Sequence, residues 1–511
     1  MPADRPAAYN QADHQQDVKV LHSMGYAQEL ERRMGRFSNF AISFSIICIL
    51  SGGINSLAQW TSGVGGAGIF LGWPLGCLIS LVFAVAMGQI ASAYPTAGGL
   101  YHWGSILGNT GLGWLTAWLN LLGLITVLGA INVGTWTFFA GAFGPALGIE
   151  ATLTAQIVFM IVVTGTQALV NHFGIRLTSL LTDFSGYLIF FGSIALTLAL
   201  LAVAPSYDFS RLVTFSNFSG AAGGDVWPAT TSIMFLFLLG LLHPIYTITG
   251  YDASAHTSEE TRQAAMSVPK GMVSSVVWSA VFGWMFLIAI VLAIPDMAKA
   301  AGQGWNVFFW LFDEVMPAWL KVFLYVVIFV AQYLCGLATV TSASRMIFAF
   351  ARDDGLPFSG ALKRVSPAHR TPVAAIWTGS ALAVLFTAYT PVYSTVVSST
   401  VIFLFVSFAV PITLGLIAYK KTWTQMGPWD LGAWFPVFAV LSILATVLIF
   451  VIGVQPPNDK ALWITVGFLA LTAVVWFGFE RRRFKGPPIG EEIARRQAVI
   501  REAERAVGEI R

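Results

Sequence analysis

The sequence predicts an all-α membrane protein with twelve transmembrane helices. Of its 511 residues, 56% are hydrophobic and only 10% are charged, whereas a soluble domain carries about a quarter charged residues. Apolar runs recur along most of the chain, and a helix of roughly 20 apolar residues spans the hydrocarbon core. A transmembrane barrel would instead show alternating segments of about ten residues. These observations exclude an ordinary soluble protein and favour a helical bundle in the bilayer.

Twelve hydrophobic segments make up the expected bundle. They cover residues 37–61, 67–93, 114–143, 151–170, 175–204, 228–253, 268–294, 319–350, 373–389, 395–419, 434–454 and 462–479. The third and eighth are long enough to bend or to lie partly at the interface, so eleven or thirteen segments are the alternatives. We divide the chain into a tail at 1–36, a five-helix block at 37–204, a second five-helix block at 228–419, two further helices at 434–479 and a tail at 480–511.

The basic residues predict the orientation of this bundle. An even number of spans places both termini on one side of the membrane. If the N-terminus is inside, seventeen Lys and Arg residues flank the inner ends of the spans, and only four flank the outer ends, namely Arg211, Lys299, Lys321 and Lys460. Positive residues gather on the cytoplasmic side. We therefore expect a multi-pass protein of the plasma membrane with both termini in the cytoplasm, and the polar N-terminus shows no signal peptide.

Two segments carry residues that interrupt a helix. The first has Ser51-Gly52-Gly53 and Asn55 near its middle, and the sixth has His243-Pro244 and Gly250. Glycines also let neighbouring membrane helices pack closely, which is the simpler interpretation. The two segments, however, begin matching five-helix blocks that enter the membrane from opposite sides. Interrupted helices in corresponding positions are typical of transporters built from inverted repeats.

A pair of interrupted helices predicts a site made largely of backbone groups. Such groups are tolerated inside a membrane only where they line a cavity. We expect the second half of the first span to begin near Ile54-Asn55 and to offer N–H groups to a carboxylate. We expect the first half of the sixth span to end near Leu241-Leu242 and to offer carbonyls to an ammonium. Together they predict a binding site for a zwitterion.

Polar side chains follow the second break at helical spacing. Tyr246, Thr249, Asp252, His256 and Glu259 lie at i, i+3, i+6, i+10 and i+13, which places them in one stripe toward the cytoplasm. We interpret Tyr246 as an aromatic shutter over the substrate, with an ordinary packed aromatic as the alternative. An acid inside the membrane is a functional candidate by default, but Asp252 is merely interfacial if the helix ends early.

Other polar residues suggest weaker roles. His243 lies near the middle of the membrane, where it contacts substrate, senses protons or satisfies a freed carbonyl. Asp183 in the fifth segment is a candidate for binding a coupling ion. Thr341 and Ser342 in the eighth segment offer hydroxyls to a cation, although such hydroxyls usually bond to their own helix.

The sequence predicts no enzyme and no cofactor. Cys48, Cys77 and Cys335 each lie alone in an apolar run, which supports neither a metal site nor a disulfide framework. The motifs of metalloproteases, serine hydrolases and P-loop proteins do not occur. We expect the bilayer and a small substrate as partners, and no nucleic acid. The oligomeric state is not predicted.

Four stretches carry a family resemblance. In chain order they read GYAQELERRMGRFSNFAISFSI at 25–46, AYPTAGGLYHW at 93–103, TGYDASAHTSEET at 249–261 and SRMIFAFARDDGLP at 344–357. Together they resemble the amino acid/choline transporter family, the γ-aminobutyrate and choline permease branch of the amino acid–polyamine–organocation superfamily. The resemblance covers nearly the whole chain up to the twelfth segment.

This resemblance implies twelve helices, a five-plus-five inverted repeat with helices 1 and 6 broken, and uptake or exchange of amino acids or related amines by alternating access. Adding the residues argued above, the expected substrate-binding residues are Ser51, Gly52, Gly53, Ile54, Asn55, His243, Tyr246, Thr247 and Gly250. The resemblance places Tyr246 at an aromatic gate and Asp252 at a gating acid. We add Glu259 and Arg345 to the gating residues.

One departure leaves the coupling ion open. Some proton-coupled members of the superfamily carry a lysine midway along the fifth segment, but the corresponding stretch here, 184–193, reads FSGYLIFFGS. A proton, a sodium ion and pure exchange therefore all stay open. The competing functional classes are an ion or solute channel and a transporter-like nutrient sensor that signals through the charged tails.

Overall fold

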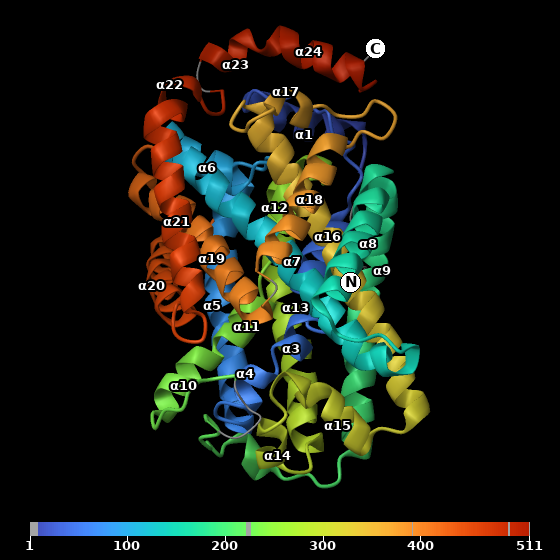
Figure 1. The fold of residues 1–511 in the computed structure, drawn as a ribbon. Helices are drawn as coiled ribbons and strands as arrows, with labels where there is room; N and C mark the ends of the chain where they lie inside the picture. Colours follow the sequence, from blue (N-terminus) through green and yellow to red (C-terminus); the bar gives the residue numbers. More distant parts are fainter. Residues whose placement is uncertain (1–8, 221–225, 391, 489–490, 510–511) are drawn as a thin grey trace, which may run out of the picture.

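The computed structural model describes residues 9–220, 226–390, 392–488 and 491–509, and in these ranges it is helical with no strands. Two isolated β-bridges occur there, Met34 with Thr261 and Tyr419 with Trp423. Figure 1 shows long helices that run along a common axis, with short helices at both ends. The predicted all-α class is confirmed.

Twelve apolar helices match the twelve predicted segments. Among the described residues, ten are long and apolar enough to span a membrane: Arg36–Thr61, Gly68–Ala93, Thr110–Leu147, Leu153–His172, Ile175–Val203, Ala264–Ala293, Ala318–Arg352, Tyr393–Ala418, Gly432–Gly453 and Asp459–Arg483. Two shorter apolar helices, Ile233–Thr247 and Val373–Tyr389, complete the set of ten plus two. The third and eighth spans are each one continuous helix, α7 (Thr110–Leu147) and α16 (Ala318–Arg352), so neither divides or is missing.

Burial separates central helices from peripheral ones. The most apolar stretches of the first and third spans are 89% and 83% buried, but those of the last two spans are only 28% and 11% buried. The first and third spans therefore form the interior, where α7 packs against α16 and against α19 (Tyr393–Ala418). The last two spans, which contain α20 (Phe435–Gly453) and α21 (Asp459–Val475), lie at the edge of the bundle (Figure 1).

The first span is interrupted in its middle. It begins as α2 (Arg36–Ile47) and continues as two short helices, α3 (Gly52–Asn55) and α4 (Ala58–Thr61). The non-helical residue Cys48 has φ 23°, in the left-handed region that few side chains adopt. The second half thus begins at Gly52, two residues before the predicted start, because Gly52 N–H already bonds to the Cys48 carbonyl at 3.2 Å.

The sixth span is also interrupted, but later than predicted. It contains α10 (Ile233–Gly240), α11 (Leu242–Thr247) and, after a non-helical stretch, α12 (Ala253–His256). α10 ends at Gly240, close to the predicted end of the first half near Leu241-Leu242, but α11 continues directly from Leu242. Ile245 N–H bonds to the Leu241 carbonyl at 3.1 Å, so the chain only bends there. A proline removes one hydrogen bond and kinks a helix, whereas α11 ends at Thr247 and the non-helical stretch after it contains Gly250, with φ +92°.

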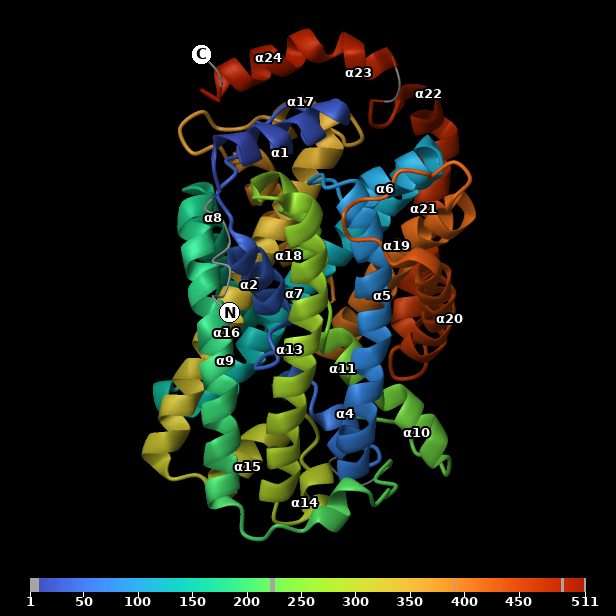
Figure 2. The same cartoon turned by 180° about the vertical axis from the view of Figure 1, so that it is seen from behind.

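Both tails lie at the same end of the bundle. The N-terminal helix α1 (Gln11–Ser23) and the C-terminal helix α24 (Gln497–Ala506) share the upper end in Figures 1 and 2, and α14 (Met297–Ala301) and α15 (Val307–Val315) lie at the opposite end. Two contacts join the tails: His14 Nε2 lies 2.7 Å from Glu509 Oε1, and His22 Nε2 lies 2.6 Å from Glu504 Oε1. An even number of spans requires this arrangement.

Candidate functional site

A small cavity lies where the two interrupted spans meet, near the middle of the bundle where α3 and α11 appear in Figure 1. Its volume is about 10 Å³, which is room for about one water molecule. The walls also include α7 and α16; the lining residues are Ile46, Ile47, Ser51, Gly52, Val127, Ile131, Tyr246, Thr247, Thr249 and Cys335. Four of the nine predicted substrate-binding residues line it: Ser51, Gly52, Tyr246 and Thr247. The cavity is therefore too small to hold an amino acid in this conformation.

Backbone groups at both breaks lack protein partners. In the part of the chain that the structure describes, the N–H groups of Ile49 and Leu50 donate no hydrogen bond, and the carbonyls of Thr247 and Ile248 accept none. Free N–H groups suit a carboxylate, and free carbonyls suit an ammonium group. The N–H groups of residues 249–252 are also without a bond among the described residues, so the first break offers donors and the sixth offers both acceptors and donors. The two breaks together can therefore bind both ends of a zwitterion.

The glycines of the first break allow very close packing. A Cβ atom on Gly52 would lie 2.7 Å from Thr247 Oγ1 and 3.0 Å from Thr247 Cα. A Cβ atom on Gly53 would lie 2.9 Å from Phe286 Cζ. Gly52 therefore lets the two interrupted spans touch beside the cavity, while Gly53 faces the seventh span instead. The glycines at 52 and 53 therefore allow close helix packing, and Gly52 also lines the cavity.

His243 supports the first break and does not line the cavity. Its Nε2 atom lies 3.1 Å from the Gly53 carbonyl oxygen, and the ring packs edge-on against Trp73 at 5.5 Å. The side chain is fully buried. Of the three roles predicted for His243, the geometry matches the one in which it satisfies a carbonyl freed by the break.

A larger pocket lies toward the end that carries α14 and α15. Its volume is about 190 Å³, and its lining includes Ile54 and Asn55 from the first span together with Trp305 and Tyr393. The Tyr246 and Tyr393 rings meet at right angles, 6.3 Å apart. Because Tyr246 lines the small cavity and Tyr393 lines the larger pocket, this aromatic contact separates the two. Sequence reasoning missed Tyr393 and Trp305, since neither belongs to a glycine, proline or charge pattern.

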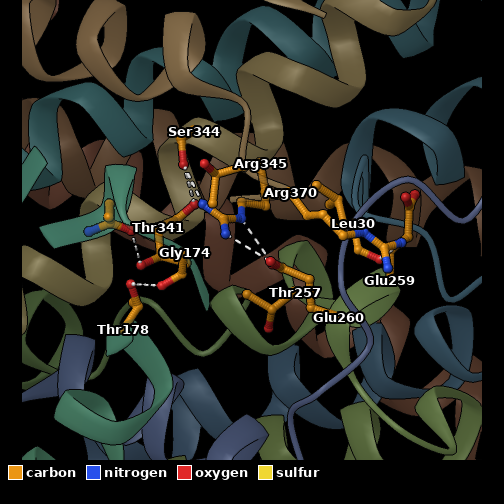
Figure 3. Close-up of polar contacts among 12 residues, drawn as sticks. Leu30, Gly174, Thr178, Thr257, Glu259, Glu260, Thr341, Ser344, Arg345 and Arg370 are labelled. Carbon is orange, nitrogen blue, oxygen red and sulfur yellow. Dashed lines mark hydrogen bonds and ion pairs between the residues drawn. The ribbon is translucent and has the colours of Figure 1, made fainter. Parts of the chain in front are cut away.

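The opposite side of the small cavity is sealed by buried ion pairs. Arg345 on α16 binds Glu260 through two hydrogen bonds, Nε to Oε2 at 2.9 Å and Nη2 to Oε1 at 2.8 Å, and both side chains are fully buried. Figure 3 shows Arg345 reaching toward Glu260, with Ser344 as a further partner and Glu259 lying apart. Such two-pronged pairs are strong and geometrically specific.

A second pair lies beside the first. Arg352 donates to both carboxylate oxygens of Glu259 at 3.0 and 2.8 Å, and the Ala97 N–H donates to Oε1 at 2.9 Å. Burial alone would raise the pKa of the Glu259 carboxyl, but the charge and hydrogen bonds of Arg352 and the Ala97 N–H hold it below its ordinary value of 4.5. The predicted gating residues Glu259 and Arg345 thus have separate partners, Arg352 and Glu260, which sequence reasoning missed.

The remaining gating candidate, Asp252, is fully buried between the break and the ion pairs. Its Oδ2 atom lies 3.4 Å from His256 Nε2 and accepts from Asn120 Nδ2 at 3.4 Å. Gly250, two residues earlier, allows the turn that leads into this region, because a side chain there would run into Ile46. Asp252 is therefore enclosed by protein, although α11 ends at Thr247, before it.

The three coupling-ion candidates do not come together. Asp183 accepts a hydrogen bond from Ser38 Oγ at 3.0 Å, near the start of α2. Thr341 Oγ1 donates to Asn171 Oδ1 at 2.7 Å and so faces the fourth span. Ser342 Oγ is buried and has no partner among the described residues. No hydrogen bond joins the three, and among the described residues no group of three or more His, Cys, Asp or Glu is arranged to hold a metal ion.

Comparison with known proteins identifies the relatives of this chain. The sequence profile described as amino acid permease matches residues 34–479. The chain is 30% identical to the amino-acid permease BAT1 of Arabidopsis thaliana over 508 residues, which covers 91% of this chain and 95% of the relative. It is 28% identical to amino-acid permease 2 of Neurospora crassa, with 92% and 88% covered. It is also 28% identical to the GABA-specific permease of Saccharomyces cerevisiae, with 70% and 64% covered.

Proposed function

The chain belongs to the amino acid permease family, and from this premise we propose that it is a secondary active transporter that moves an amino acid or a related small amine by alternating access. Membership of this family makes the protein a multi-pass membrane transporter of amino acids and not an enzyme. The proposal adds the mechanism, the site and the direction from which the substrate reaches it.

One observation carries the proposal: two interrupted spans face each other across a cavity that is closed on one side by two buried ion pairs. On the other side, a pocket of about 190 Å³ reaches the Tyr246–Tyr393 contact. Two ion pairs close one side of the cavity, and a single aromatic contact closes the other. A carrier needs this asymmetry because its site opens to one side of the membrane at a time. A channel needs a continuous pore, so the asymmetry favours a carrier.

The substrate enters this cavity only if the walls move apart. We assign the carboxylate to the first break, where the N–H groups of Ile49 and Leu50 are free next to Ser51 and Gly52, and the ammonium to the free carbonyls of Thr247 and Ile248. None of the side chains that line the small cavity is charged. This composition supports a substrate whose side chain is neutral, because a buried charge without a partner is costly.

The orientation follows from the distribution of basic residues and the shared position of the tails. We assign the end that carries α1 and α24 to the cytoplasm and the pocket beside Tyr393 to the outside, in the plasma membrane. The blocks at 37–204 and 228–419 act as the two halves of an inverted repeat, since each begins with an interrupted helix. In this orientation the structure corresponds to a carrier closed on its inner side.

The test is transport by purified protein in liposomes. A panel of labelled L-amino acids and γ-aminobutyrate is offered to vesicles preloaded with the same unlabelled compound, and saturable exchange is the expected result. Unitary currents in a planar bilayer would indicate a channel. Binding without flux, measured by a ligand-dependent shift in melting temperature, would indicate a sensor. Either outcome overturns the proposal.

A further inference from the structure

Asp252 and His256 form a buried pair that neither ion pair of the inner side uses. They are four residues apart at the start and end of α12, which lies in Figure 1 between α11 and the end that carries the tails. Both side chains are fully buried, and His256 Nε2 lies 3.4 Å from Asp252 Oδ2. The pair thus lies directly between the second break and the Arg–Glu layer.

The hydrogen bonds of His256 show which nitrogen carries its proton. His256 Nδ1 lies 3.1 Å from the carbonyl oxygen of Ala97. A carbonyl only accepts, so Nδ1 must be the donor. In a neutral imidazole the other nitrogen, Nε2, then presents a lone pair to the Asp252 carboxylate. Two acceptors facing each other are unfavourable, and one additional proton on either atom turns the contact into a hydrogen bond.

No neighbouring side chain among the described residues supplies a donor between Asp252 Oδ2 and His256 Nε2. Asp252 Oδ1, Asn120 Oδ1 and the Tyr251 hydroxyl are buried without partners among the described residues. From α19, Ser407 presents only a neutral hydroxyl, which accepts from Asn120 at 3.4 Å. The pair therefore sits in an under-satisfied polar cluster inside the membrane.

The charged groups around the pair are already committed. Tyr251 is the titratable neighbour on the same stretch of chain. On the other side of Ala97, whose carbonyl faces His256, Glu259 and Arg352 bind each other. Arg345 binds Glu260, and Asp353 lies 3.3 Å from His102. No Lys or Arg forms an ion pair with Asp252 in the described part of the chain. An ionised Asp252 beside a neutral His256 would be a lone buried charge, which is costly in a membrane protein.

We propose that Asp252 and His256 are the proton-binding site that couples substrate movement to proton movement, an inference that rests on the proposed carrier function. In the inner-closed form, a proton from the outer water binds to Nε2 or Oδ2, and no other bond is made or broken. When the ion-pair layer opens, cytoplasmic water reaches the pair, hydrates the carboxylate and takes up the same proton. A neutral zwitterion then crosses with one net positive charge per cycle.

A proton fits this site better than a metal cation. Hard cations are bound by several oxygen atoms, whereas the pair offers an imidazole lone pair that faces a carboxylate at 3.4 Å. A proton needs only these two atoms. The site thus assigns proton coupling to a chain that lacks the lysine found in the fifth span of some relatives.

The experiment compares two driving forces in liposomes, using the compound that exchanges fastest in the panel of L-amino acids and γ-aminobutyrate. Accumulation is driven by an inward proton gradient or by an inside-negative potassium diffusion potential, and exchange is measured at equal pH. Internal pH is followed with a pH-sensitive dye. The variants are D252N and H256N. The controls remove the same groups elsewhere, D313N at an exposed position and H369N at a half-buried one.

Wild-type protein and both controls are expected to accumulate substrate under either driving force, with substrate-dependent acidification of the vesicles. In D252N and H256N, gradient-driven accumulation should fall to the level seen without a gradient, a larger loss than that of exchange. A second readout, the pH dependence of the substrate-induced shift in melting temperature, should flatten in both variants even if transport is lost. Acidification that persists in D252N overturns the inference, as does a sodium requirement. Wild-type exchange without proton movement overturns the inference alone, whereas absence of any wild-type flux overturns the carrier function.

Discussion

The guanidinium of Arg345 binds the Glu260 carboxylate through two hydrogen bonds, of 2.9 and 2.8 Å, in a place where neither side chain contacts solvent. The pair links the eighth span to the end of the interrupted sixth span. Two charges that have both lost their water depend on each other, because removal of one leaves the other buried and unpaired. The pair is therefore the part of the inner closure that responds most sharply to mutation.

Truncation of Arg345 should open the inner side. We expect R345A to lose about 3–5 kcal/mol of the stability of the closed form. The readout is labelling of Cys335, which lines the cavity, by a membrane-impermeant thiol reagent from the inner side. The control is K321A, which removes a lysine from an exposed pair with Asp313 worth about 0–1 kcal/mol. Equal labelling of Cys335 in the two variants would contradict this role.

The neighbouring pair predicts a pH dependence. The pKa of Glu259 is held below 4.5 by Arg352 and the Ala97 N–H, so its stabilising effect is fully present above pH 4.5 and is lost as the pH falls through the lower folded value. The melting temperature of the detergent-solubilised protein should therefore drop as the pH is lowered below 4.5. E259Q should melt lower at pH 7 and lose part of this pH dependence, whereas E314Q should keep it. A wild-type curve that is flat down to pH 3 would exclude the effect.

The contact between Tyr246 and Tyr393 predicts an aromatic gate on the outer side. We expect Y246A and Y393A to raise the KM for exchange and to leak substrate, because each removes the ring that separates the two cavities. Y246F should retain most of the function, since the ring contact remains. The control is Y389A, which removes a tyrosine that is 80% exposed. Unchanged KM and leak rate in Y246A would remove it from the gate.

Gly52 predicts a steric test of the site. In G52V, the added Cβ would lie 2.7 Å from Thr247 Oγ1 and 3.0 Å from its backbone, which should cost about 1–3 kcal/mol and abolish exchange by pushing the two breaks apart. The matched control is G165V, another glycine in a membrane span, whose Cβ would meet nothing within 4 Å. Exchange at the wild-type rate in G52V would show that the breaks do not form the site.

Much of this architecture could be predicted because the membrane imposes simple rules. Long apolar runs revealed twelve spans, and Gly250 marked the second break because only glycine readily adopts its left-handed backbone. Pro244 misled, since a proline kinks a membrane helix without ending it. The partners of Glu259 and Arg345 depend on side-chain directions that spacing alone does not show. Tyr393 lies close to Tyr246 only through the packing of the tenth span against the sixth, which is a tertiary relationship.

The docking of the tails has a consequence for the order in which the chain is made. The Gln28 N–H donates to Glu504 at 3.0 Å across 476 residues, and Gln28 Nε2 also donates to the Glu259 carbonyl at 2.8 Å. This contact cannot form until Glu504 has left the ribosome. All twelve spans precede Glu504 in the chain, so the contact between the two tails forms only after every span has been synthesised. A chain truncated before Glu504 would enter the membrane without the contact between Gln28 and the C-terminal tail.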